Sequence, residues 1–192
     1  MKNTLLMRTE ASYSFNFLVY IQNIYLNQNN SGDKVKFPFM PTKYEFRKDF
    51  EICYRRLWEG ISMRISENPL NDLVFFIEKK ALFYQHLFVE NNDTLNDFNE
   101  IYDSFKVWWN SFAGRFSIEK SIDAYEQNMY AELANTLMEK RMTPKKELNI
   151  SLIYDECLLL DLEPSSYFAV LSIRDCILKN KEFIAKLQVS IN

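Results

Sequence analysis

Glycine and proline are scarce in this chain, with only 3 Gly and 5 Pro among 192 residues. A β-sandwich or β-barrel needs many tight turns, and a phosphate-binding loop needs clustered glycines. The shortage therefore disfavours both kinds of structure and favours helices joined by short connections.

Histidine and cysteine are also rare. His86 is the one histidine, and nothing in the sequence places a nucleophile beside it for a Ser–His or Cys–His pair. A single histidine also excludes the usual zinc sites and the di-iron motif of helix bundles. The 3 cysteines form no Cys-x-x-Cys pair, so we expect free buried thiols in a reducing cytoplasm. The sequence predicts no cofactor and assigns no catalytic residue.

Strong net charge and long apolar runs are lacking too. The formal net charge is −3, whereas nucleic-acid binders usually carry a basic field. The apolar run that starts at Phe15 is interrupted by Asn16 and Gln22 and is too short to span a bilayer. We therefore expect a soluble cytoplasmic protein that binds neither nucleic acid nor membranes.

Apolar and aromatic residues are abundant, at 47% and 16% of the chain. These proportions are typical of a globular protein that buries a core. The length is that of one domain. The pattern predicts a single all-helical domain over residues 1–192, in which residues 28–41 form an irregular extended connection.

Helix periodicity and capping residues predict an all-α bundle of about seven helices with short connections. A Thr42-x-x-Glu45 capping box and an Asn68-Pro69 restart mark two of the boundaries. No repeated short β-branched runs are evident between the helices. The helices are expected over residues 12–28, 42 to the restart at 68, 69–90, 94–111, 117–141, 143–162 and 166–189.

Two of these helices are predicted to lie centrally because they are apolar on nearly every side. The helix over 143–162 contains the run 158–160, which is all leucine. The helix over 69–90 should turn its main face to the core; that face comprises Leu70, Leu73, Ile77, Ala81, Tyr84 and Phe88.

Aromatic residues outside the expected core stripes are the candidates for partner binding. Trp108 and Trp109 are neighbours on one helix and cannot both face inward, so Trp108 is expected to point sideways. Phe37 and Phe39 alternate in the segment 34–41, where two prolines favour an extended conformation over a strand. Such side chains anchor interfaces, although packing against a neighbouring helix is the alternative.

Arg64 continues a core-facing stripe of the second predicted helix. A buried arginine must pair with a carboxylate or bind an anion. The alternatives for Arg64 are therefore an internal ion pair, an anion site, or a guanidinium that extends to water from the helix end.

Three carboxylates share one side of the fifth predicted helix. Glu119, Asp123 and Glu126 stand at i, i+4 and i+7. Clustered carboxylates bind Mg²⁺ through oxygen, but the same spacing is also common on solvated helix faces.

These observations favour a non-enzymatic interaction module, a small regulator, inhibitor or adaptor that binds another protein or a second copy of itself. Two alternatives remain open. One is a sensor domain with an apolar ligand pocket. The other is a Mg²⁺-dependent phosphoanhydride hydrolase built on Glu119, Asp123 and Glu126.

Overall fold

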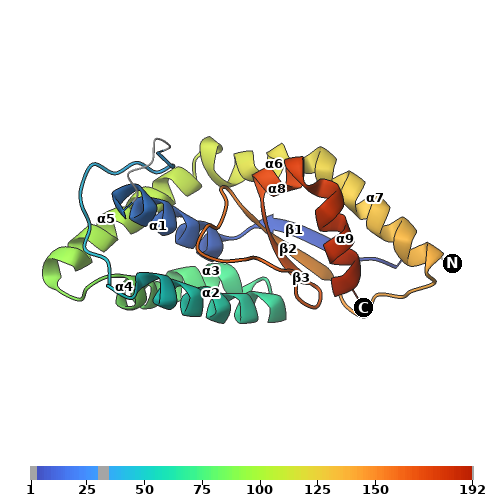
Figure 1. Cartoon of the computed structure of the whole chain (residues 1–192), viewed down its shortest axis with the longest axis horizontal. Helices are drawn as coiled ribbons and strands as arrows, with labels where there is room; N and C mark the ends of the chain where they lie inside the picture. The colour runs from blue at the N-terminus through green and yellow to red at the C-terminus, as the bar shows by residue number, and fades with distance from the viewer. Residues whose placement is uncertain (1–3, 30–34, 192) are drawn as a thin grey trace. The chain divides into compact units, whose positions relative to one another are not determined.

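The structure is a computed structural model that describes residues 4–29 and 35–191. It is a mixed α/β protein with a three-stranded parallel sheet, so the all-α prediction is wrong. The chain forms two compact units (Figure 1). Unit 1 comprises the described parts of Met1–Ser12, Phe112–Glu156 and Asp161–Asn192. Unit 2 comprises Tyr13–Ser111 and Cys157–Leu160. The single domain stays a prediction.

Unit 1 contains the sheet, in the order β1-β2-β3. The strands are β1 (Met7–Ala11), β2 (Leu148–Ile153) and β3 (Phe168–Ser172). Both pairs are parallel, with Thr9 opposite Ile150 and Ile150 opposite Ala169. Most side chains of β2 and β3 are buried, as is usual for parallel strands.

The strands could not be predicted because they are short and the strands they pair with are distant in the sequence. β2 falls inside the helix expected over 143–162, and β3 inside the one expected over 166–189. An apolar run of five or six residues fits a buried strand or a helix segment equally well. The pairing of β1 with β2 decides between them, and periodicity cannot detect such a pairing.

The helices of unit 1 follow Ser111 and β3. The fifth predicted helix is divided at Ile122, and a short turn, η1 (Phe112–Phe116), kinked at Gly114, precedes it. α7 packs against α9, and α6 packs against β1 and β2. The helices are α6 (Ser117–Ser121), α7 (Asp123–Glu139), α8 (Ile173–Leu178) and α9 (Asn180–Ser190).

Unit 2 is built around α1 (Tyr13–Asn29), which packs against α2, α3 and α5. Its residues from Ser14 to Ile24 are all buried. Asp72, on a different helix, accepts hydrogen bonds from the backbone amides of Tyr13 and Ser14, and so satisfies the free donors at the start of α1. The other helices are α2 (Phe50–Glu67), α3 (Asn71–Glu78), α4 (Lys80–Leu87) and α5 (Asn92–Trp109).

Aromatic rings fill the core of unit 2. Phe17 of α1 lies with its ring centroid 5.5 Å from Phe76, 5.2 Å from Phe83 and 5.1 Å from Phe105. These edge-on and tilted contacts have the geometry that aromatic pairs prefer. The high aromatic content thus serves mainly to pack the helices around α1.

Two predicted helices differ from the observed ones in unit 2. The second begins at Phe50, so the Thr42-x-x-Glu45 pattern caps no helix. The third is interrupted at Lys79, where α3 ends and α4 begins. Within the described residues, no helix has both the length and the apolar composition needed to cross a membrane.

Candidate partner-binding surface

Residues 35–41, which we call the strap, run along the surface of unit 2 without regular secondary structure. Residues 30–34 of the predicted connection lie outside the described residues. α1 continues to Asn29 and so includes the first two residues of the predicted connection. The strap leads into the irregular segment before α2.

Amide side chains of α1 hold the backbone of the strap. Asn27 Nδ2 donates to the carbonyls of Lys36 (2.7 Å) and Pro38 (3.0 Å), and Asn27 Oδ1 accepts from the Lys36 amide (2.9 Å). Asn23 Nδ2 donates to the Phe37 carbonyl at 2.7 Å. An extended segment without a neighbouring strand must satisfy its backbone groups in some other way. Here Asn23 and Asn27 take the place of a strand.

A second part of unit 2 is tied to the same helix. Gln22 is fully buried, and its Oε1 accepts hydrogen bonds from the amides of Leu158 (2.8 Å) and Leu159 (3.3 Å). Gln22 Nε2 donates to Asn23 Oδ1 at 3.2 Å. The predicted central helix over 143–162 is therefore absent here, and an irregular segment hydrogen-bonded to α1 takes its place.

The structure brings together two of the three aromatic residues proposed for partner binding. The ring centroids of Phe37 and Trp108 lie 5.0 Å apart, and both rings pack on Tyr20 of α1 at 5.8 and 5.9 Å. Burial raises the pKa of Tyr20, opposed by a hydrogen bond with Ser104, so this phenol is neutral at physiological pH. Trp108 is half-buried and gives the strap a rigid aromatic base.

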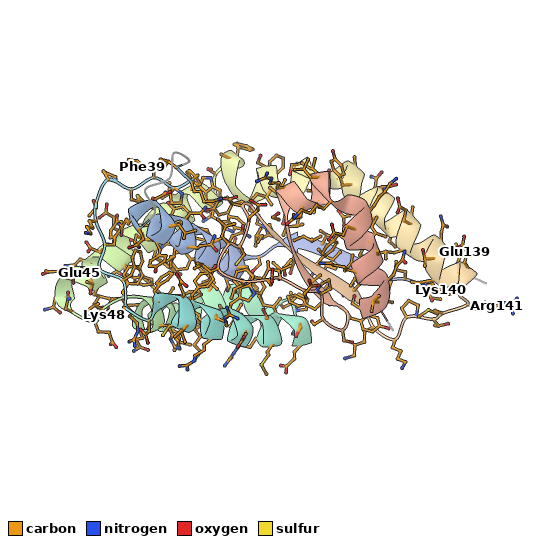
Figure 2. All side chains as sticks on the ribbon, in the orientation of Figure 1. Phe39, Glu45, Lys48, Glu139, Lys140 and Arg141 are labelled. Atoms are coloured by element: carbon orange, nitrogen blue, oxygen red, sulfur yellow. The ribbon has the colours of Figure 1, made fainter. Side chains whose placement is uncertain are left out.

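The outer side of the strap is apolar and exposed. Val35, Phe37 and Phe39 are 63%, 49% and 64% exposed, whereas Pro38 between them is buried. Phe39 is labelled in Figure 2 at the periphery of unit 2. We define the aromatic surface as Val35, Phe37, Phe39 and Trp108. All four belong to unit 2.

Arg64 lies near the end of α2 and is exposed. Its guanidinium carbon lies 5.3 Å from the centroid of the Phe75 ring, a cation–π distance. Among the described residues, no carboxylate lies within ion-pair distance of Arg64. The guanidinium therefore covers the edge of the apolar core and extends to water.

The three predicted metal-binding carboxylates line one polar pocket of about 290 Å³ in unit 1. Glu119 pairs with Arg115 at 2.8 Å and accepts from the Ala11 amide at 3.2 Å. Asp123 pairs with Lys120 at 2.9 Å. The remaining lining includes Glu126, Thr9, Glu10, Ile122 and Leu152.

This pocket is not arranged as a metal site. Among residues 4–29 and 35–191, no group of three His, Cys, Asp or Glu side chains is placed to hold a metal ion. Glu119 also has a structural task, since it joins the end of β1 to the helix that follows η1. The prediction placed all three carboxylates on one helix, but Glu119 belongs to α6 and the other two to α7. Glu119 and Asp123 are each paired with a neighbouring cation.

A small apolar cavity also lies in unit 1, between α7, β3, α8 and α9. Its volume is about 10 Å³, which is the space of one water molecule. A bound metabolite needs several hundred cubic ångströms. This cavity therefore does not serve the ligand-sensor hypothesis.

Two of the three cysteine thiols lie in surroundings that disfavour the thiolate. Burial raises the pKa of the Cys157 thiol to about 11 and that of Cys176 to about 12, so both remain protonated at neutral pH. All three cysteines are free. His86 Nδ1 lies 2.9 Å from the carbonyl of Leu82 on its own helix.

Sequence reasoning missed the residues that build the strap. Tyr20, Asn23 and Asn27 stand on α1, and the sequence analysis assigned none of them a role. The available signal was the spacing of Asn23 and Asn27 at i and i+4, which places two amides on one helix face. Comparison with protein families, curated proteins and solved structures finds no match to this chain.

Proposed function

We propose that this chain is a non-enzymatic protein-binding module that contacts its partner through the aromatic surface. The observation that carries the proposal is the packing of Phe37 on Trp108, with Val35 and Phe39 exposed on either side. Exposed apolar side chains are ordinary when they are scattered singly. A group of them that includes three large rings is typical of an interface.

Pre-organisation supports the same function. Binding costs free energy when loops must be ordered, and a segment already fixed in place avoids most of that cost. Asn23 and Asn27 fix the strap through four hydrogen bonds, and Tyr20 supports the rings from below. The strap can therefore present Phe37 and Phe39 to a partner without rearranging.

The partner that fits is a protein with an apolar depression able to accept Phe39. Phe39 is the most exposed ring of the strap and makes no ring contact with another described aromatic residue. It should act as the inserted side chain, while Phe37 and Trp108 form the flatter area beside it. The free thiols support a cytoplasmic location for this encounter.

The test is affinity purification of the tagged chain from its source cells, with quantitative comparison of the proteins that come with it. Phe39→Ser should reduce the amount of a specific partner at least about 10-fold, as expected when an interface anchor is removed. Leu178→Ser is the matched control, because Leu178 is 67% exposed but lies in unit 1.

The partner would then be purified, and its affinity for each variant measured. Binding that is lost with Phe39→Ser and kept with Leu178→Ser supports the proposal. If Phe37→Ser and Phe39→Ser both retain full affinity while the proteins remain folded, the aromatic surface is not the binding site.

A further inference from the structure

The sheet of unit 1 has an open edge at β1. Among the described residues, β1 pairs with β2 on one side and with no strand on the other (Figure 1). In a parallel ladder, alternate residues of a strand turn both main-chain groups toward the same neighbour. The Leu148 amide donates to the Leu6 carbonyl, so Leu6 and every second residue after it face β2. Met7 and Thr9 therefore turn their amides and carbonyls away from the sheet, and we call these four groups the open edge.

Side chains cap the strand on either side of the open edge. The Tyr130 hydroxyl donates to the Leu5 carbonyl at 3.4 Å, and Glu119 accepts from the Ala11 amide at 3.2 Å. Between these two caps, the open edge makes no hydrogen bond within the part of the chain that the structure describes. Two amides and two carbonyls in a row without partners are the template that an added strand completes.

The pocket lined by Glu119, Asp123 and Glu126 lies beside the open edge, and we call it the acidic pocket. Thr9 is also one of its lining residues. Thr9 Oγ1 is buried and has no hydrogen-bond partner among the described residues. The described lining holds four carboxylates and one guanidinium. The pocket beside the open edge therefore carries an excess of negative charge.

Glu126 is the carboxylate of this lining that lacks a cation. The other three each pair with an arginine or a lysine, at 2.8 to 2.9 Å. Among residues 4–29 and 35–191, no cation lies within ion-pair distance of Glu126, although its side chain is half-buried. A carboxylate withdrawn from water is stabilised by a cation. The acidic pocket, of about 290 Å³, leaves room for one basic side chain from another molecule.

We propose that β1 binds an extended peptide segment of a second protein, which adds an antiparallel strand at the open edge and places a lysine or arginine in the acidic pocket. An antiparallel edge strand on a parallel sheet is common, and its pairing is slightly more stable than parallel pairing. This site goes beyond the proposed function, which uses the aromatic surface of unit 2.

The register of the added strand follows from the position of the pocket. Residues directly opposite each other in a sheet direct their side chains to the same face. The peptide residue opposite Thr9 therefore points to the side on which Thr9 lines the acidic pocket. Its main-chain amide and carbonyl pair with those of Thr9, and the hydrogen bonds supply affinity while the pocket selects the side chain.

A second copy of β1 fits this edge less well than a basic peptide does. Pairing two copies edge to edge brings two acidic pockets to one interface, and like charges placed together disfavour association. A lysine or arginine instead meets the uncompensated carboxylate of Glu126. The charge of the pocket thus favours a basic segment of another protein.

Amide hydrogen exchange of the full chain tests whether the edge is open. In the free protein, the amides of Met7 and Thr9 should exchange much faster than those of Arg8 and Glu10, which face β2. Addition of a basic peptide at about 1 mM should slow exchange at Met7 and Thr9 at least about 5-fold. Protection of Met7 and Thr9 in the free protein would show that the edge is already covered, and would overturn the inference.

The probe is the acetylated and amidated peptide Val-Thr-Lys-Thr-Val, whose binding is measured by calorimetry. We expect a dissociation constant on the order of 100 µM. Two control peptides should each bind at least about 10-fold more weakly. One has glutamate in place of lysine and tests the pocket; the other has an N-methyl group on the lysine amide and tests main-chain pairing. Equal affinities for the three peptides, or no binding of any of them at about 1 mM, overturns the inference.

A variant of the pocket gives a readout that a folding defect cannot imitate. Glu126→Gln should weaken binding of the lysine peptide by about 5-fold to 20-fold and should not weaken binding of the glutamate peptide, which the lost carboxylate repels. Glu139→Gln is the matched control, because Glu139 is exposed on the same helix and does not line the pocket. Full affinity of Glu126→Gln for the lysine peptide contradicts the site. Phe39→Ser should leave peptide binding unchanged, so this result is separable from the test of the aromatic surface.

Discussion

Arg141 has a backbone conformation that suits glycine better than arginine, with φ of 55°. It follows α7, where the Arg141 amide donates to the Met138 carbonyl and the Met142 amide to the Leu137 carbonyl. These two bonds form the Schellman motif that commonly ends a helix. The predicted helix end at Lys140-Arg141 is confirmed, since α7 stops at Glu139 (Figure 2).

Arg141→Gly should therefore stabilise the protein by about 0.5–1 kcal/mol, because glycine adopts this conformation without the steric cost that arginine bears. Lys140 has an ordinary φ of −78°, so Lys140→Gly serves as the matched control and should destabilise. The measurement is the denaturant midpoint of each variant. Loss of stability in Arg141→Gly would mean that the arginine makes contacts that outweigh its backbone strain.

Cys176 should make stability depend on alkaline pH. Burial, helped by the charge of Asp175, raises its pKa to about 12, whereas an unfolded thiol has a pKa of about 8.5. Between these values the unfolded state loses the proton and the folded state keeps it, so the free energy of unfolding falls as pH rises. Cys176→Ala should show a shallower fall between about pH 8.5 and 11. Parallel curves for the two proteins would contradict the assignment.

At the scale of secondary structure, the helices α1 and α5 could be predicted and the strands could not. The expected spans 12–28 and 94–111 agree closely with Tyr13–Asn29 and Asn92–Trp109. Both are long and begin at capping or polar residues. The strands have five or six residues each, and only their tertiary pairing distinguishes them from helix segments.

α3 turns a different face to the core than predicted: Leu70, Leu73 and Ile77 are exposed, and Phe75 and Phe76 are buried in their place. The prediction assumed one continuous helix from Leu70 to Phe88. It therefore placed Leu70 on the same side as Tyr84 and Phe88, which are buried. The break at Lys79 changes the backbone direction, so residues before it no longer share a face with residues after it. A helix break of a single residue inside an apolar run leaves no strong signal in the sequence.

The segment Cys157–Leu160 should depend on a single side chain of α1. Gln22→Ala would remove the buried acceptor of the Leu158 and Leu159 amides, whose hydrogen bonds are partly buried, and should cost about 1–3 kcal/mol of stability. Hydrogen exchange at these two amides should become faster. Gln85→Ala on the exposed side of α4 is the control and should change neither quantity. Unchanged exchange in Gln22→Ala would show that other contacts hold the segment.

At the scale of the whole molecule, part of the candidate surface could be foreseen and part could not. The sideways orientation of Trp108 follows from helix geometry. The extended conformation of the strap follows from its two prolines. Their meeting over Tyr20 could not be inferred, because it depends on how Asn23 and Asn27 hold the strap against α1. The carboxylates of unit 1 share a pocket, and their ion pairs with Arg115 and Lys120 are local, at i,i+4 and i,i+3. What the sequence could not indicate is the hydrogen bond from the distant Ala11 amide to Glu119.

Site-specific photo-crosslinking at Phe39 in the source cells tests the central proposal most directly, because it reports contact and not a change in stability. Replacing Phe39 with a photoreactive phenylalanine derivative should give a light-dependent adduct heavier than 23.0 kDa, containing one specific partner. The same derivative at Leu178 should not give that adduct. Absence of any adduct at Phe39, or the same set of adducts at both positions, would contradict the assignment of the aromatic surface as a protein-binding site.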